Sequence, residues 1–294
     1  MLTIALSFAI ALAGATLTRA DSLEQSIRQR IATTPGAFVA VTYHDLQNGD
    51  RIVLNADSVF HAASTMKVPV MIEVLKRAQQ GAFSLDQSVL LVNQFTSLAD
   101  GSPFSMIKAD DEDTALYTHV GERVPIRDLL RRMITRSSNF ATNELIALVG
   151  ATNVTATARA LGATRMQVLR GVEDQKAFDA GLINTTTSAD LATLLLAIEE
   201  GKVLSPQSSS EMREILLAQE VNDRIPAGLP LGTPVAHKTG DITAISHDAA
   251  IVYPPGRRPY VLVVLTRGIR DPKESSTLIA DVSRMVYAHA TAVH

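Results

Sequence analysis

The chain has 294 residues, 46% of them hydrophobic and 19% charged, so it is long enough to bury a large core and lacks the composition of a disordered protein. Its 27 basic and 30 acidic residues nearly balance, and no basic stretch interleaved with aromatic residues predicts a nucleic-acid partner. The absence of cysteine excludes disulfides, thiol catalysis and cysteine-ligated metal sites.

The N-terminus has the pattern of a secretory signal. Residues 2–18 are almost wholly apolar and small, and Ala20 offers a small residue ahead of a cut before Asp21. The apolar run falls a little short of the ~20 residues that a membrane-spanning helix needs. We therefore interpret residues 1–20 as a signal peptide and expect the mature chain to be exported, periplasmic or secreted, without stable membrane insertion.

The remaining chain begins and ends with strand patterns. Near the N-terminus, a helix over 22–31 is followed by a hairpin of strands at 37–43 and 51–54, joined by Asn48-Gly49-Asp50. The C-terminal third contains three further predicted strands and a closing helix, at 235–239, 249–253, 260–266 and 271–290.

The middle of the chain is mostly helical in its periodicity. A helix beginning at Ser64 is closed by Gly81, and a long polar loop covers 93–122. Further helices are predicted at 126–134, 141–149, 152–161, 188–200 and 205–218, the first with Pro125 in its first turn.

Strands at both ends and helices between them predict an α/β (α+β) fold: an antiparallel sheet flanked by the N- and C-terminal helices, with an inserted all-helical subdomain. In a single catalytic domain over 21–294, the α/β part covers about 21–62 and 202–294, and the helical part about 63–201. We expect a cleft between the two parts.

The first chemical signal is Ser64-Thr65-Met66-Lys67, at the point where a loop becomes a helix. An amine one helical turn after a hydroxyl can reach it, so the pair is a candidate activated nucleophile. A second Ser-x-x-Lys, Ser105 to Lys108, leads into an acidic loop without helical spacing. Context therefore favours Ser64 over Ser105.

Two further motifs follow in order: Ser137-Ser138-Asn139 at a turn between helices, and Lys238-Thr239-Gly240 at the end of a strand pattern. With these three segments the sequence resembles the penicillin-recognising serine hydrolases, and among them the class A β-lactamases, whose motif set has this form. The resemblance extends from about Phe38 to the C-terminal helix.

The chemistry of an activated serine assigns the first roles. A serine hydroxyl needs a base, and Lys67 is the nearby candidate, with a pKa that burial and the second cation Lys238 would lower. The resemblance implies that Ser137 relays a proton to the leaving nitrogen and that Asn139 binds the substrate's side-chain amide.

The resemblance also implies how the substrate is held. Lys238 and Thr239, with Gly240 of the same motif, would bind the substrate carboxylate, and the backbone N–H groups of Ser64 and Asp241 would form the oxyanion hole. His247, nine residues after Lys238, falls near the position at which many class A enzymes carry an arginine for that carboxylate.

Glu173 decides the expected type of enzyme. It lies 36 residues after Ser137, close to the interval at which class A enzymes carry the glutamate that activates the deacylating water. The family continues with Leu-Asn three and four residues later, whereas this chain has Lys176-Ala177; Asp174 is the next candidate. Ser138 stands where class A enzymes usually have aspartate, and Asp241 puts a carboxylate beside the anion site.

We therefore expect a serine β-lactamase that is acylated at Ser64 and releases product with a water activated by Glu173, needs no cofactor, and acts as a monomer on a small-molecule β-lactam. The alternatives are a D-alanyl-D-alanine carboxypeptidase or an esterase on the same scaffold, or a sensor domain that is acylated without turnover. No metal site is expected, because the histidines show no ligand spacing.

Overall fold

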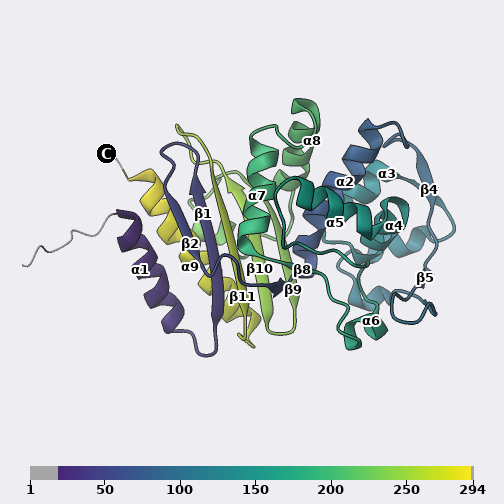
Figure 1. Ribbon diagram of the computed structural model, residues 1–294, viewed down its shortest axis with the longest axis horizontal. Coiled ribbons are helices and arrows are strands. Elements are labelled where there is room, and N and C mark those ends of the chain that lie inside the picture. The colour runs from purple at the N-terminus through teal and green to yellow at the C-terminus, as the bar shows by residue number, and fades with distance from the viewer. Residues whose placement is uncertain (1–18, 293–294) are drawn as a thin grey trace, which may run out of the picture.

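The computed structural model describes residues 19–292, so the apolar run interpreted as a signal lies, up to residue 18, outside the described residues. A five-stranded antiparallel sheet in the order β2-β1-β11-β10-β9 forms the centre of the molecule (Figure 1). Its strands are β1 (Phe38–Asp45), β2 (Arg51–Leu54), β9 (Val235–Ile242), β10 (Ile245–Val252) and β11 (Tyr260–Arg267). The first strands pair with the last ones, which confirms that both ends of the chain build one sheet.

The N- and C-terminal helices, α1 (Arg19–Ala32) and α9 (Pro272–Thr291), lie against each other on one face of the sheet (Figure 1). Strand side chains alternate between faces, so one set of β-strand residues packs under these helices in a separate apolar cluster with Leu278 and Val282. The predicted helix-flanked antiparallel sheet is confirmed.

The opposite face of the sheet is covered by α7 (Ser188–Glu199), which contacts β1, β10 and β11. Beyond it lies the helical part, whose core is continuous with that face of the sheet. This part consists of α2 (Lys67–Gln79), α3 (Ile126–Thr135), α4 (Asn139–Val149), α5 (Ala151–Ala160), α6 (Gln175–Asp179) and α8 (Pro206–Leu217). Because α8 contacts both β9 and α3, it joins the two parts.

Short elements refine the predicted boundaries. Pro125 ends the strand β7 (Arg123–Pro125) and caps α3 instead of entering its first turn, while α4 starts two residues before the predicted position. The polar stretch 93–122 contains a small hairpin and two 3₁₀ turns. These and the other short elements are β3 (Phe60–His61), β4 (Ser88–Leu90), β5 (Phe95–Thr96), β6 (Pro103–Phe104), β8 (Thr185–Thr186), η1 (Ala63–Met66), η2 (Lys108–Asp110), η3 (Thr114–His119) and η4 (Pro226–Gly228).

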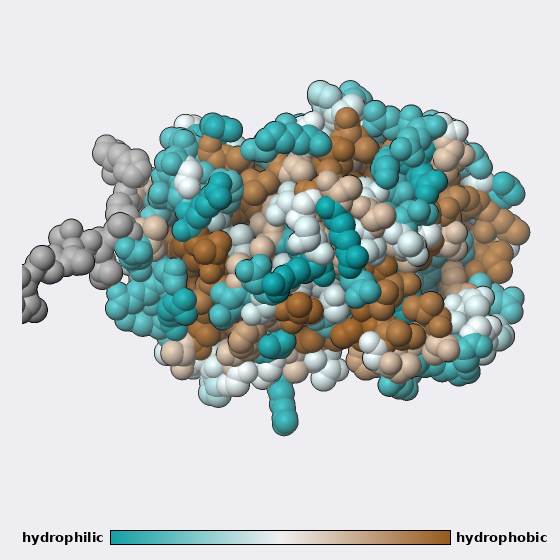
Figure 2. All heavy atoms as spheres, viewed as in Figure 1, coloured by the Kyte–Doolittle hydropathy of each residue, from teal (hydrophilic) through white to brown (hydrophobic). Residues whose placement is uncertain are grey.

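The surface mixes polar and apolar residues, with apolar side chains gathered at the end of the molecule that carries β4 and β5 (Figure 2). Among residues 19–292, the structure contains no helix with the length and apolar character required to cross a bilayer.

Candidate active site

Ser64 is the second residue of η1, a single 3₁₀ turn that runs directly into α2. The preceding Ala63 has φ of 44°, an uncommon conformation for a residue with a side chain, of the kind often found beside functional groups. The edge strand β9 packs against this turn so closely that a Cβ on Gly240 would lie 2.8 Å from the backbone nitrogen of Ser64. Glycine is therefore required where β9 passes the serine.

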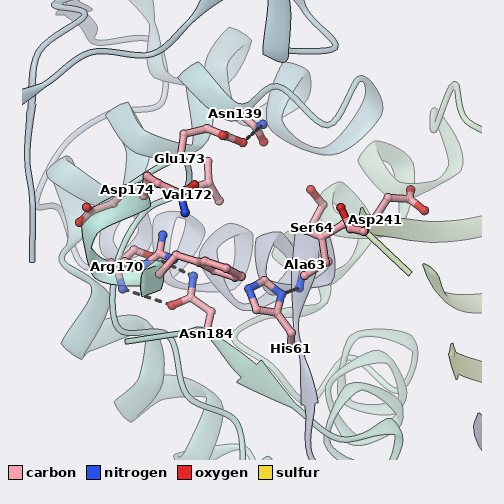
Figure 3. A pocket seen from close by; sticks show the side chains of 14 residues that line it. His61, Ala63, Ser64, Asn139, Arg170, Val172, Glu173, Asp174, Asn184 and Asp241 are labelled. Carbon is pink, nitrogen blue, oxygen red and sulfur yellow. Dashed lines mark hydrogen bonds between the residues drawn. The ribbon is translucent and has the colours of Figure 1, made fainter. Parts of the chain in front are cut away.

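A pocket of about 450 Å³ opens beside Ser64 (Figure 3). Ser64 and Asp241 lie on one side of it, and Asn139 and Glu173 lie on the other. Within the described part of the chain the Ser64 hydroxyl makes no hydrogen bond, so it is available to a substrate. The cleft expected between the sheet and the helical part is therefore present at this serine.

Two buried lysines meet at Ser137. The side chains of Lys67 and Lys238 are fully buried, and each Nζ lies 3.1 Å from Ser137 Oγ. Lys67 also donates to the Ser137 carbonyl at 2.5 Å and to Asn139 Oδ1 at 2.8 Å. Burial, and then repulsion from Lys238, lowers the pKa of Lys67 well below its usual value, and burial lowers the pKa of Lys238 to about 7. The Ser137 hydroxyl thus joins the two lysines in one buried hydrogen-bonded cluster.

The first turn of α4 is held by a carboxylate from the 93–122 loop. Asp111 accepts from the backbone N–H groups of Asn139 and Phe140 at 3.0 and 2.8 Å, and from the Tyr117 hydroxyl at 3.1 Å. Ser138 caps the same helix through Ala141 N. Asp111 therefore supplies the buried carboxylate that the sequence lacks at Ser138, and a helix N-terminus favours it.

Glu173 also has a left-handed backbone, with φ of 60°, and its carboxylate accepts from Asn139 Nδ2 at 3.0 Å. The residue before it is fixed by Asn143, whose side-chain amide bonds both the N–H and the carbonyl of Val172. Partial burial, followed by repulsion from Asp110, raises the pKa of Glu173 above its usual value. Glu173 is thereby held with its carboxylate at the pocket.

Asp174, the next candidate from sequence, has a different position. Its two oxygens accept from Ser97 Oγ at 2.7 Å, Leu98 N at 2.8 Å and Ala177 N at 3.1 Å, and its side chain is buried. It caps α6 and ties that helix to the β5–β6 hairpin, which makes it a structural residue. Of the two carboxylates, Asp174 has both oxygens occupied by structural donors, whereas Glu173 is bound by Asn139 at the pocket.

The residues proposed for the substrate carboxylate are only partly brought together. Lys238, Thr239 and Gly240 lie within β9 beside Ser64. His247 is fully buried and lies outside the pocket, with its ring nitrogens against the backbone of Ser246, His61 and Thr266. Burial lowers the pKa of His247 to about 4, so its ring is neutral. The structure does not place His247 where it could bind an anion.

Sequence reasoning missed a buried arginine behind the pocket residue Asp241. Arg224, in the segment before η4, reaches Asp241 with Nη2 at 2.6 Å and the His247 carbonyl with Nη1 at 2.9 Å. His61, which lines the pocket next to Ala63, was also missed. The histidine that sequence spacing suggested stands seven residues after the Lys238-Thr239-Gly240 motif, whereas nothing in the sequence around Arg224 marks it.

The competing Ser105 motif does not form a site. Ser105 and Lys108 are exposed on the 93–122 loop, and only Met106 between them is buried. Over residues 19–292, no group of three or more histidine, aspartate or glutamate side chains is arranged to hold a metal ion.

A scan against protein-family models matches residues 22–290 to a model described as the beta-lactamase enzyme family. The chain belongs to this family. The beta-lactamase AST-1 of Nocardia asteroides is 31% identical over 261 residues, which cover 87% of this chain and 80% of that protein. The expected kinship with penicillin-recognising serine enzymes is confirmed.

Solved structures of beta-lactamase relatives have the same fold. A mutant of PBP-A in an acyl-enzyme complex with penicillin-G is 30% identical and has a TM-score of 0.75, covering 90% of this chain and 95% of that one. A variant of the last common ancestor of Gram-negative class A beta-lactamases is 27% identical with a TM-score of 0.80, covering 92% and 99%. As a member of the beta-lactamase family, this chain is a serine hydrolase.

Proposed function

We propose that this protein is a class A serine β-lactamase, which opens the β-lactam ring through an acyl-enzyme on Ser64 and releases the product with a water activated by Glu173. The observation that carries the proposal is a pocket lined by an unbound Ser64 hydroxyl, Asn139 and Glu173, with the buried Lys67–Ser137–Lys238 cluster joined to it through the bond from Lys67 to Asn139.

In acylation, neutral Lys67 takes the proton from Ser64 Oγ, which attacks the lactam carbonyl carbon. The backbone N–H groups of Ser64 and Asp241 stabilise the oxyanion, each at a contribution on the order of 3 kcal/mol. When the carbon–nitrogen bond breaks, the ring nitrogen receives a proton from Ser137 Oγ. That hydroxyl regains a proton from the lysine that accepted it, because both amines lie within 3.1 Å.

In deacylation, Glu173 takes a proton from a water that attacks the ester carbonyl, and the proton returns to Ser64 as the bond to the enzyme breaks. Asn139 contacts both Lys67 and Glu173, so its side-chain amide fixes the positions of these two groups relative to each other. Ala177, at the position where relatives carry an asparagine, offers no second amide. Because of this difference, the alternative function is that of a protein that is acylated at Ser64 and releases the acyl group slowly.

The test is a titration of the purified mature chain with a chromogenic cephalosporin, followed by mass spectrometry. We expect many turnovers per chain, no turnover with Ser64→Ala, and a stable adduct on Ser64 with Glu173→Gln. A single stoichiometric burst by the unmodified chain would instead indicate an acylated sensor or a penicillin-binding protein. Rapid cleavage of a simple ester without lactam turnover would indicate an esterase, and release of D-alanine from a D-alanyl-D-alanine peptide would indicate a carboxypeptidase.

Export and a monomeric state belong to the same proposal. Export is supported by the apolar run ahead of Asp21. N-terminal sequencing of the chain recovered outside the cytoplasm should begin near Asp21, and its sedimentation should match a mass below the 31.5 kDa of the full chain.

A further inference from the structure

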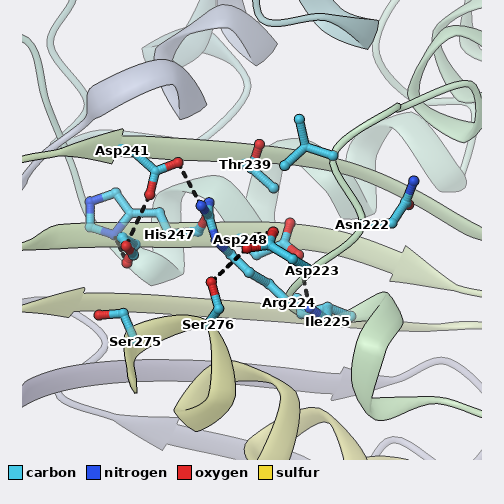
Figure 4. A network of polar contacts seen from close by, with 12 residues as sticks. Asn222, Asp223, Arg224, Ile225, Thr239, Asp241, His247, Asp248, Ser275 and Ser276 are labelled. Carbon is cyan, nitrogen blue, oxygen red and sulfur yellow. Dashed lines mark hydrogen bonds and ion pairs between the residues drawn. The ribbon is translucent and has the colours of Figure 1, made fainter. Parts of the chain in front are cut away.

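Arg224 binds the side chain of Asp241, the residue directly after the Lys-Thr-Gly motif. Its Oδ2 accepts from Arg224 Nη2 at 2.6 Å, and its Oδ1 accepts from Ser246 Oγ at 2.9 Å (Figure 4). Both oxygens are therefore occupied by donors, one of them a guanidinium. A charge-assisted pair of this length is among the stronger side-chain hydrogen bonds.

Arg224 is deeply buried, whereas Asp241 faces the pocket. The Arg224 side chain is 6% exposed and that of Asp241 is 48% exposed. Within residues 19–292, Arg224 Nε is buried without a hydrogen-bond partner, and Asp223 Oδ1 lies 3.7 Å from that nitrogen. A buried guanidinium requires a compensating anion, and the closest one in this structure is Asp241.

The pair lies where an anionic substrate would bind. Thr239 and Asp241 are two residues apart on β9, so their side chains point to the same side of the strand, the side on which Arg224 lies (Figure 4). Asp241 also lines the pocket that contains Ser64. A substrate carboxylate bound at Thr239 would therefore approach Arg224 at the atom that Asp241 already occupies.

We propose that Asp241 is a specificity-determining residue that competes with the substrate's carboxylate for Arg224, so that this enzyme favours acyl substrates that are neutral beside the scissile amide. The inference rests on the proposed function. Asp241 repels a bound anion and neutralises the arginine, and both effects weaken binding of the carboxylate without changing the reacting groups.

The experiment compares two chromogenic cephalosporins that differ only in the group beside the lactam nitrogen, the free carboxylate and its methyl ester. The ratio of kcat/KM for acid over ester is measured for the unmodified enzyme, for Asp241→Asn and for Asp223→Asn. Asp223 is a matched control, because it is another carboxylate near Arg224 but is exposed and bonded to Ser276, away from the pocket. Asp241→Ser is a second variant in case the amide disturbs folding, which thermal melting would reveal.

We expect Asp241→Asn to raise the acid-to-ester ratio by about tenfold or more, the size expected when one like charge is removed a few ångströms from a bound anion. Asp223→Asn should leave the ratio within about twofold, because exposed charges are largely screened. An unchanged ratio in both Asp241 variants, with both substrates still hydrolysed, would overturn this inference and leave the proposed function intact. If the unmodified enzyme turns over neither substrate, both fail.

Discussion

Strand β9 has different chemistry on its two sides. On the side of the helical part, Lys238 is buried toward Ser137, and Gly240 touches the turn that carries Ser64. On the side of α9, His237 contacts Asp248 at 2.9 Å and Asp241 contacts Arg224 at 2.6 Å. We call these the lysine side and the arginine side of β9.

The two sides are assembled in different ways. The lysine side joins short motifs whose members stand within three residues of one another, and it holds the reacting groups. The arginine side depends on the segment 222–225, which folds back across β9 and β10 through Asn222, Arg224 and Ile225. We infer that the lysine side carries the chemistry together with Lys238 as one anchor for the substrate carboxylate, while the arginine side adjusts which substrates bind.

Replacing Lys67 by methionine should have the largest effect, because it removes the proposed base and keeps an unbranched side chain that is only one atom shorter. We expect kcat/KM to fall by about 10²–10⁴-fold, the usual contribution of a general base. Stopped-flow kinetics with a chromogenic cephalosporin would show the loss in acylation. Lys76→Met is the matched control on the same helix, since Lys76 bonds Glu73 and Thr157 away from the pocket. Equal losses in both variants would argue that Lys67 acts only through folding.

Gly240→Ala should have the next largest effect. Its Cβ would lie 2.8 Å from Ser64 N and 2.9 Å from Thr65 N, so β9 must move away from the oxyanion hole. Losing one oxyanion donor typically lowers kcat by about 10²–10³-fold. Steady-state kinetics would measure this loss. Circular dichroism melting would separate it from unfolding, and a variant of normal activity would show that β9 does not set the oxyanion geometry.

The length of each secondary-structure element decided whether the sequence could predict it. The long strands and helices carry periodic apolar residues, so the sheet and most helices are confirmed. Two-residue strands such as β3 and β8 carry no such period and become strands only by pairing with each other. The local sequence pattern is therefore sufficient to predict the long strands and helices and insufficient to predict the two-residue strands.

At the site, sequence reasoning succeeded where chemistry is local and missed what distant segments supply. Asp111 and Arg224 lie in stretches without a motif, 28 residues before Asn139 and 17 residues before Asp241. His247 was chosen by its distance along the chain, and pairing does bring it opposite Gly240. Its ring nevertheless points into the core, because the face of a strand, and not the spacing, decides what a side chain contacts.

Asp248→Asn tests whether the arginine side positions Arg224. Asp248 is fully buried, and its oxygens contact His237 Nδ1 at 2.9 Å and the Ile225 N–H at 3.0 Å. An amide cannot accept at both oxygens, so we expect the free energy of unfolding to fall by about 1–3 kcal/mol, the cost of one unsatisfied buried group. Because Ile225 adjoins Arg224, KM should rise severalfold with kcat kept. Urea denaturation and steady-state kinetics check the two parts, and a fall in kcat at constant KM would contradict the division.

The smallest expected effect is on the alkaline pH profile, and it distinguishes the two sides by substrate. Burial lowers the pKa of Lys238 to about 7, so this ammonium, a proposed ligand of the substrate carboxylate, loses its charge as the pH rises through that value. We expect kcat/KM for a carboxylate-bearing β-lactam to fall above about pH 7. For its neutral ester kcat/KM should fall less, since the ester has no anion for the Lys238 ammonium to bind.

The acid limb of the pH profile should be the same for both substrates. Its midpoint should lie above the usual glutamate pKa, because the pKa of Glu173 is raised and its protonated form cannot act as a base. Lys238→Arg, which stays charged throughout, should remove the alkaline difference between the two substrates. Identical alkaline limbs for acid and ester in the unmodified enzyme would mean that the titrating group near pH 7 serves the chemistry on the lysine side and not the binding of the anion.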